Sequence, residues 1–141
     1  MRQLALALLA AAALVAAGCG SSSEPATPED VVSTAVKALG KGDAPKVCDQ
    51  LDAAGKRKLV AGLRKGPQGL PRIVSTSCVD GIGQVITKLP RTIRAELAKG
   101  NVEKAKITGN TATVLVSLTT LRAELRKTGD KWLISGAFFE K

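Results

Sequence analysis

The chain of 141 residues contains no histidine and no tyrosine, and its aromatic residues are only Trp132, Phe138 and Phe139. Without histidine it lacks the commonest metal ligand and the one side chain whose ordinary pKa lies close to neutrality. With so few rings, it also lacks the aromatic platforms on which single-stranded nucleic acids stack. These absences argue against a zinc centre, a histidine-based catalytic site and a nucleic-acid partner.

Motifs of the common catalytic and nucleotide-binding sites are missing as well. The chain has no Gly-x-Ser-x-Gly nucleophile motif, no phosphate-binding loop and no cluster with metal-ligand spacing. The run Gly81-Ile82-Gly83 is too short for a nucleotide fingerprint, and it lies in a helical pattern where glycines favour close helix contact. We therefore expect no cofactor, no metal and no enzymatic activity.

The longest apolar run, Leu4 to Ala17, has 14 residues and is too short for a spanning helix, which needs about 20. Its length, together with Arg2 before it, is typical of a secretory signal peptide. The run ends in Ala16-Ala17-Gly18-Cys19 and resembles the lipobox of bacterial lipoproteins, in which small residues precede a cysteine that becomes lipidated. The sequence departs from the usual lipobox at Ala16, where leucine is commoner.

This resemblance implies that residues 1–18 are removed and that the Cys19 thiol carries a diacylglyceryl group. Residues 19–27, rich in serine and proline, would form a flexible tether. The chain would then be anchored through lipid to a cell membrane or cell envelope, on the extracytoplasmic side. Two other interpretations stay open: an ordinary cleaved signal peptide with Cys19 as a bystander, and an uncleaved anchor.

Removal of residues 1–18 leaves 123 residues, enough for one domain, which we place at 28–141. The remaining chain has 20 basic and 12 acidic side chains, a net charge of +8. Residues 53–106 alone carry 12 basic and three acidic side chains. The positive charge is therefore concentrated in the middle of the chain.

A basic segment of this kind attracts anionic lipid headgroups or anionic wall polymers. The candidate anion surface comprises Lys56, Arg57, Lys58, Arg64, Lys65, Arg91 and Arg94. The alternative is a solvated helical face that serves only to keep the protein soluble.

Cys48 and Cys78 remain once Cys19 is assigned to the lipid, and export would place them in a compartment that permits oxidation. A bridge between them would close a loop of about 30 residues and stabilise the fold by about 3.5 kcal/mol. Free buried thiols and a metal site are the alternatives, but neither cysteine has the neighbouring ligands that zinc requires.

The first half of the domain has apolar residues at helical spacing. Helices are expected near Thr27, Gly42-Asp43, Asp52, Cys78 and Pro90, each of which precedes or begins such a pattern. Thr27 and Pro28 are typical of a helix start, and Gly40 predicts the end of the first helix. Residues 66–71 predict a loop because glycine and proline support neither period.

From about residue 102 the apolar period changes from helical to two. Gly109-Asn110 and Gly129-Asp130 are tight-turn dipeptides between alternating segments. Four antiparallel strands are expected, near 102–108, 111–118, 121–128 and 131–139. Helices followed by a strand meander predict the α+β class.

This order resembles that of small exported lipoproteins with a nuclear transport factor two-like domain, also called SnoaL-like or cystatin-like. The matching segments are Pro28 to Val32, Gly42-Asp43, Val47 to Leu51 with Cys78 one helix later, Ile107 to Ala112, and Lys127 to Trp132. The resemblance implies N-terminal helices packed on a curved, cone-shaped, four-stranded antiparallel sheet.

In that family the cone can enclose an apolar cavity, and its enzymes, including lyases and isomerases, work there with tyrosine, aspartate and histidine. This chain has neither tyrosine nor histidine, so we expect a non-catalytic domain that binds a small apolar ligand or a protein partner. The expected apolar lining is Val114, Val116, Leu125, Trp132 and Ile134. Alternatively these side chains simply fill the core, or the basic surface is the functional one.

Overall fold

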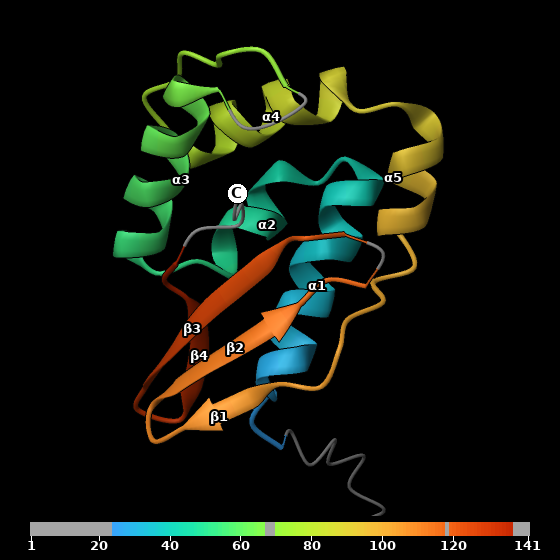
Figure 1. The fold of residues 1–141 in the computed structure, drawn as a ribbon. Helices are drawn as coiled ribbons and strands as arrows, with labels where there is room; N and C mark the ends of the chain where they lie inside the picture. Colours follow the sequence, from blue (N-terminus) through green and yellow to red (C-terminus); the bar gives the residue numbers. More distant parts are fainter. Residues whose placement is uncertain (1–23, 67–69, 118, 137–141) are drawn as a thin grey trace, which may run out of the picture.

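The computed structural model describes residues 24–66, 70–117 and 119–136, and these form five α-helices followed by four strands (Figure 1). The α+β class predicted from the sequence is therefore correct. The predicted signal peptide, Cys19 and the first part of the tether lie outside the described residues. Within the described residues, no helix is both long enough and apolar enough to cross a membrane.

The helices occupy the first two thirds of the described chain. Their bounds are α1 (Pro28–Lys41), α2 (Ala44–Asp49), α3 (Ala53–Lys65), α4 (Cys78–Lys88) and α5 (Arg91–Leu97). The strands are β1 (Lys106–Thr108), β2 (Thr111–Leu115), β3 (Arg122–Thr128) and β4 (Lys131–Ile134).

Helix α1 begins where the sequence predicts, with Pro28 as its first residue. The Thr27 hydroxyl accepts a hydrogen bond from the Asp30 amide at 3.2 Å, and the Asp30 carboxylate accepts one from the Thr27 amide at 3.0 Å. This reciprocal capping box satisfies two amides that the helix itself leaves unpaired.

The end of α1 differs from the prediction, because the helix continues past Gly40 to Lys41. The left-handed residue that ends it is Gly42, with φ of 85°. Gly40 instead allows α5 to approach: a Cβ at Gly40 would lie 2.3 Å from the Ala98 amide nitrogen and 2.5 Å from the Arg94 carbonyl oxygen. Its lack of a side chain serves helix packing and not helix termination.

The four strands pair in sequence order as an antiparallel meander. One row across the sheet places Ile107 opposite Ala112, Ala112 opposite Leu125, and Leu125 opposite Ile134. The last three are buried, whereas Ile107 on the edge strand is 56% exposed. The structure therefore places the apolar residues of the alternating pattern on the buried face of the sheet.

All four strands are shorter than predicted, β3 by one residue only, and hydrogen bonds to other segments explain two of these cases. Ahead of β1, the amide of Ala105 donates to the carboxylate of Glu29 in α1 at 2.8 Å, not to a neighbouring strand. After β4, the amides of Ser135 and Gly136 both donate to the carbonyl oxygen of Glu124, at 2.8 and 3.1 Å. The predicted strand residues 137–139 and Leu118 lie outside the described part.

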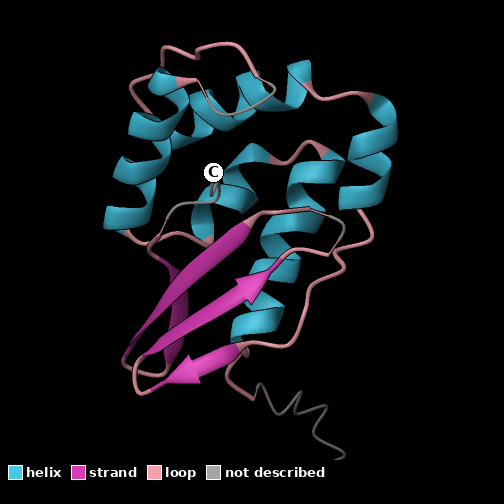
Figure 2. Cartoon of the chain, viewed as in Figure 1, coloured by secondary structure: helices cyan, strands magenta, loops and turns pink. Residues whose placement is uncertain are grey.

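Helix α1 has contacts with both β2 and β4, and α2 and α5 pack against α1 in turn. Figures 1 and 2 show α3, α4 and α5 in a layer at the opposite end of the domain from the start of α1. One cluster of buried apolar side chains contains residues from all five helices and from β2, β3 and β4. The hydrophobic core thus continues from the sheet into the helical layer.

Candidate functional site

Cys48 and Cys78 form a disulfide, as the sequence predicts, with Cα atoms 6.0 Å apart. Cys48 belongs to α2, Cys78 is the first residue of α4, and both are buried. The bridge therefore fixes the start of α4 against α2. Cys78 also lines the largest of the open pockets described below.

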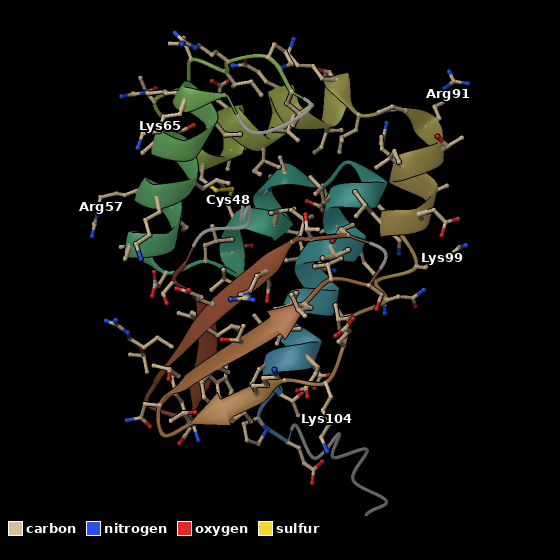
Figure 3. The ribbon with its side chains drawn as sticks, viewed as in Figure 1. Cys48, Arg57, Lys65, Arg91, Lys99 and Lys104 are labelled. Carbon is tan, nitrogen blue, oxygen red and sulfur yellow. A yellow bond between two sulfur atoms is a disulfide. The ribbon has the colours of Figure 1, made fainter. Side chains whose placement is uncertain are left out.

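The predicted anion surface is divided between two helices. Five of its residues lie on α3, namely Lys56, Arg57, Lys58, Arg64 and Lys65. The other two, Arg91 and Arg94, lie on α5. Figure 3 shows Arg57 and Lys65 on one side of the helical layer and Arg91 on the other. The structure therefore does not bring the seven residues together into one patch.

An open groove of about 330 Å³ runs along α3. We call it the α3 groove, and its lining is Lys56, Arg57, Val60, Ala61, Arg64, Thr76 and Cys78. The five α3 residues fall at i, i+1, i+4, i+5 and i+8, which is one helical face. Three of these lining residues are basic and none is acidic, so the lining carries a net positive charge.

The wall opposite α3 is the segment that leads into α4, and hydrogen bonds from backbone and side-chain groups hold it in place. The amide of Ile73 donates to the Leu63 carbonyl oxygen at 2.9 Å, and Nη2 of Arg64 donates to the Ser75 carbonyl oxygen at 3.0 Å. Ser75 is buried, and its hydroxyl both donates to the Ser77 carbonyl oxygen at 2.7 Å and accepts from the Ser77 amide at 3.2 Å. The groove is therefore a preformed feature.

Gly81 in α4 is the residue that lets this wall pack closely. A Cβ at Gly81 would lie 2.8 Å from Cδ1 of Leu63 in α3, closer than real Cβ contacts allow. The close helix contact predicted for Gly81-Ile82-Gly83 is thus correct for Gly81. It is wrong for Gly83, where an added Cβ would meet nothing within 4 Å.

The five side chains expected to line an internal cavity share one face of the sheet. Val114, Val116, Leu125 and Ile134 are at most 2% exposed and lie within the core cluster. Trp132, the second residue of β4, is half-buried, and Nζ of Lys127 lies 5.8 Å from its ring centroid. Four of the five residues are therefore part of the packed core, and Trp132 lies on the edge strand β4.

Two small pockets lie between the helices and the end of the sheet. One, of about 30 Å³, is lined by apolar residues of α1, α2, α4 and α5 together with Leu121. The other, of about 110 Å³, is lined by Val36, Ile93, Glu96, Leu97, Asn101, Val116, Ser117 and Thr119. Sites for drug-sized ligands are usually about 300 Å³ or more, so both pockets are small by comparison.

A pocket of about 220 Å³ lies on the opposite face of the sheet. Its lining, Glu103, Lys104, Lys106, Thr113, Leu115 and Arg122, mixes both signs of charge. It therefore offers less selective attraction for an anion than the α3 groove does.

Two acidic groups at the start of α1 have perturbed pKa values. The hydrogen bond from the Ala105 amide lowers the pKa of the Glu29 carboxyl below its ordinary value. The backbone hydrogen bond from Thr27 likewise lowers the pKa of the Asp30 carboxyl. Both groups are stabilised as anions, which is the opposite of the raised pKa that a carboxyl needs to act as a base near neutrality.

Among the residues that the structure describes, Ser75 is the buried polar side chain, and no group of three or more acidic or cysteine residues is placed to hold a metal ion. Sequence reasoning did find Lys56, Arg57 and Arg64 of the groove. It missed Thr76 and the structural part played by Ser75, because neither belongs to a periodic pattern.

Comparisons of the chain with protein-family models, with curated protein sequences and with solved structures give no significant match in any of the three.

Proposed function

We propose that the chain is an extracytoplasmic lipoprotein, held at a cell membrane by acyl chains on Cys19, whose domain binds an anionic ligand without catalysing a reaction. The support for the anchor is the apolar segment from Leu4 to Ala17 followed by Gly18-Cys19. The Cys48–Cys78 disulfide supports it too, since such bridges persist in oxidising compartments.

The observation that carries the binding proposal is the α3 groove. It is open, it is about three times larger than the larger internal pocket, and basic side chains lie at both of its ends. Arg64 is already oriented by its hydrogen bond to Ser75, so less conformational entropy is lost when a ligand binds. A groove with these properties suits an anionic ligand better than an apolar one.

A small apolar ligand is a second candidate, because the 110 Å³ pocket has an apolar wall formed by Val36, Leu97 and Val116. An apolar cavity of about 150 Å³ holds a ligand as small as benzene. A small hydrocarbon that raises the melting temperature would support this function. The rise should disappear in Ile93→Trp, which adds bulk at a partly exposed residue of the lining. No thermal shift with any small hydrocarbon would remove this candidate.

We also propose that the domain is of the nuclear transport factor two-like type, with a sheet curved around α1. The helices-first order, the meander and the contacts of α1 with β2 and β4 support this. Lyase or isomerase activity of the SnoaL-like type would need a polar group inside the fold. The inward side chains Ala112, Val114, Ala123 and Leu125 are apolar and buried, so these four provide no acid or base for such a reaction.

The anchor is tested by expressing the full-length chain in a bacterial host and measuring where it fractionates. We expect it in the membrane fraction, with a diacylglyceryl mass on Cys19 and without residues 1–18. Cys19→Ala should abolish the modification, whereas Cys48→Ala/Cys78→Ala should leave the protein membrane-bound. An unmodified, uncleaved chain in the cytosol would refute the anchor.

Binding is tested by titrating the same protein with inorganic polyphosphate at low and at physiological salt. Lys56→Glu/Arg57→Glu should weaken binding, because both residues line the groove. Lys58→Glu/Lys65→Glu is the matched control, since it makes the same change in net charge on the same helix outside the lining. If the two variants lose affinity equally, the groove is not the site and only the net charge matters.

A further inference from the structure

We propose that the Cys48–Cys78 disulfide is a redox switch for the α3 groove. The groove binds its anion tightly only while the bridge is closed, and a bound anion in turn protects the bridge from reduction. This inference rests on the proposed anion binding and adds the way in which that binding is regulated. Two features carry it: the place of the groove within the loop that the bridge closes, and the packing of α3 on α4.

The whole lining of the groove belongs to the loop that the bridge closes. Six of the seven lining residues lie between Cys48 and Cys78 in the sequence, and the seventh is Cys78 itself. Both sides of the groove, α3 and the wall opposite it, are therefore parts of one covalently closed segment. Because the bridge and the groove share Cys78, any displacement of this residue changes the lining.

Helix α3 is attached to the rest of the domain at its start and along α4. At its start, the Asp52 amide donates to the Ile134 carbonyl oxygen at 3.0 Å, and a Cβ at Gly55 would overlap that oxygen. Beyond this first turn, the element against which α3 mainly packs is α4. Leu63 of α3 lies directly against Gly81 of α4 in this contact. The position of the groove-lining face of α3 therefore depends on where α4 lies.

The wall opposite α3 is attached to the same two helices. Its hydrogen bonds to the Leu63 carbonyl oxygen and from Arg64 connect it to α3. On the other side, Nε2 of Gln84 in α4 donates to the Val74 carbonyl oxygen of the wall at 3.3 Å. Helix α3, the wall and α4 are therefore connected as one unit, and the groove exists only while that unit is intact.

Helix α4 joins this unit to the rest of the domain, and the bridge is the covalent part of that joint. The most extensive contacts of α4 are with α2, and Cys78 is the first residue of α4. With the bridge closed, the start of α4 cannot leave α2. With the bridge open, non-covalent contacts alone hold it, and a unit of this kind can open at a lower free-energy cost than global unfolding. The opened form has no groove, so the apparent affinity falls with the fraction of molecules that are closed.

The switch acts in both directions because binding and reduction are linked. In the reduction, a dithiol gives two electrons and two protons to the bridge; the dithiol becomes a disulfide, and Cys48 and Cys78 become thiols. An anion that binds the closed form more tightly by a given factor makes the reduction less favourable by the same factor. Couplings of this kind are typically 5- to 150-fold, and we expect about tenfold here.

The experiment uses the full-length protein, purified from the membrane of its host in a zwitterionic detergent. It is equilibrated with reduced and oxidised dithiothreitol at a series of ratios, with and without saturating inorganic polyphosphate. Alkylation and mass spectrometry then give the fraction of open bridges. Polyphosphate should raise about tenfold the ratio of reduced to oxidised dithiothreitol at which half of the bridges are open. The reduced protein should bind polyphosphate about tenfold more weakly than the oxidised protein.

Two charge variants test whether this protection comes from the groove. Lys56→Glu/Arg57→Glu changes two lining residues and should remove most of the protection. Lys58→Glu/Lys65→Glu makes the same change in net charge on α3 outside the lining and should keep it.

A bridge variant and hydrogen exchange test whether the opening is local. Cys48→Ala breaks the bridge but keeps Cys78 in the lining, so under reducing conditions it should bind polyphosphate as weakly as the reduced wild type. In both proteins the amides of α3 and of residues 73–77 should exchange within minutes, while those of β2 and β3 stay protected on that timescale.

Two results would overturn the inference and leave the proposed function intact. In the first, the oxidised and reduced proteins bind polyphosphate equally well. In the second, the amides of β2 and β3 in the reduced protein exchange as fast as those of α3, because the bridge would then support the whole domain and not the groove in particular. If the oxidised protein does not bind polyphosphate at all, the proposed anion binding itself fails, and the inference fails with it.

Discussion

The carboxylate of Glu29, in the first turn of α1, accepts a hydrogen bond of 2.8 Å from the backbone amide of Ala105, 76 residues further along the chain. This contact ties the segment entering β1 to the N-terminal end of α1. Because the amide stabilises the ionised carboxylate, it lowers the pKa of Glu29 below the ordinary value of 4.5. Folding and the ionisation of Glu29 are therefore linked.

This linkage predicts a loss of stability in acid. A carboxyl with a lowered folded-state pKa contributes its stability fully above its unfolded pKa, and the contribution disappears as the pH falls through the folded value. The contribution should thus decline below about pH 4.5. Asp30, whose pKa is lowered by the backbone hydrogen bond from Thr27, should act in the same direction around and below 3.8. Urea unfolding at a series of pH values measures both.

Glu29→Gln should be less stable than the wild type at pH 7 by about 1 kcal/mol, a value discounted for the partial exposure of the side chain. Its stability should also fall less steeply in acid, since the group that titrates is gone. Glu24→Gln, at an exposed residue ahead of α1, is the control and should change neither quantity. An unchanged acid limb in Glu29→Gln would show that the Ala105 contact does not contribute.

The capping box of α1 gives a second prediction. Thr27→Ala removes the hydroxyl that accepts from the Asp30 amide, and this should destabilise the domain by about 1 kcal/mol. Thr27→Ser keeps the hydroxyl and should lower the free energy of unfolding by only a few tenths of a kcal/mol. Thermal unfolding of the two variants separates loss of the cap from loss of the threonine methyl group; equal destabilisation would contradict a capping role.

The disulfide gives a third. Cys48→Ala/Cys78→Ala should lower the free energy of unfolding by about 3.5 kcal/mol. The bridge joins cysteines 30 residues apart, and without it the unfolded chain regains the conformational entropy that closing this loop removes. Reducing agent should destabilise the wild type toward the same value and leave the double variant unaffected. If the double variant is as stable as the oxidised protein, the bridge contributes nothing to folding.

Gly40 gives a fourth, with a control in the same chain. Gly40→Ala should destabilise by about 1–3 kcal/mol, because the added Cβ overlaps backbone atoms of Arg94 and Ala98 in and beyond α5. Gly62 in α3 has nothing within 4 Å of an added Cβ, so Gly62→Ala should stabilise by about 0.5–1 kcal/mol through helix propensity. Chemical denaturation of both variants is the measurement. A stabilising Gly40→Ala would mean that α5 does not pack as closely as described.

Local patterns predicted some elements well and others only in part. The Thr27-Pro28 start, the stripe of α4 and the turns at Gly109-Asn110 and Gly129-Asp130 depend on neighbouring residues, and the sequence identifies them correctly. The prediction that Gly40 ends α1 was wrong. A glycine that ends a helix and a glycine that allows close helix contact cannot be told apart from the sequence alone. The true end, Gly42, is marked by its positive φ.

The strand ends show the same limit. Alternation indicates which side chains face the core, but it does not say where backbone hydrogen bonds stop. The carboxylate of Glu29 accepts a hydrogen bond from the Ala105 amide. The carbonyl oxygen of Glu124 accepts hydrogen bonds from the amides of Ser135 and Gly136, beyond the end of β4. Both interactions connect residues distant in sequence, so no local pattern contains them.

The sequence by itself determined the class of the fold, which residues share the apolar side of the helices and of β2 and β3, and a positive charge concentrated in the middle of the chain. Each of these depends on composition or on periodicity along the backbone. For Cys48 and Cys78 the sequence favoured a bridge but left free thiols and a metal site open, and the structure decided for the bridge. Only the tertiary structure decided that Arg57 and Lys65 lie on the opposite side of the helical layer from Arg91 (Figure 3), and that three of the basic residues meet Thr76 and Cys78 in one groove. A groove is formed by packing between segments distant in sequence, and no local pattern says which of them come together. Gly40, where an added Cβ would meet backbone atoms of Arg94 and Ala98, is another contact of this kind.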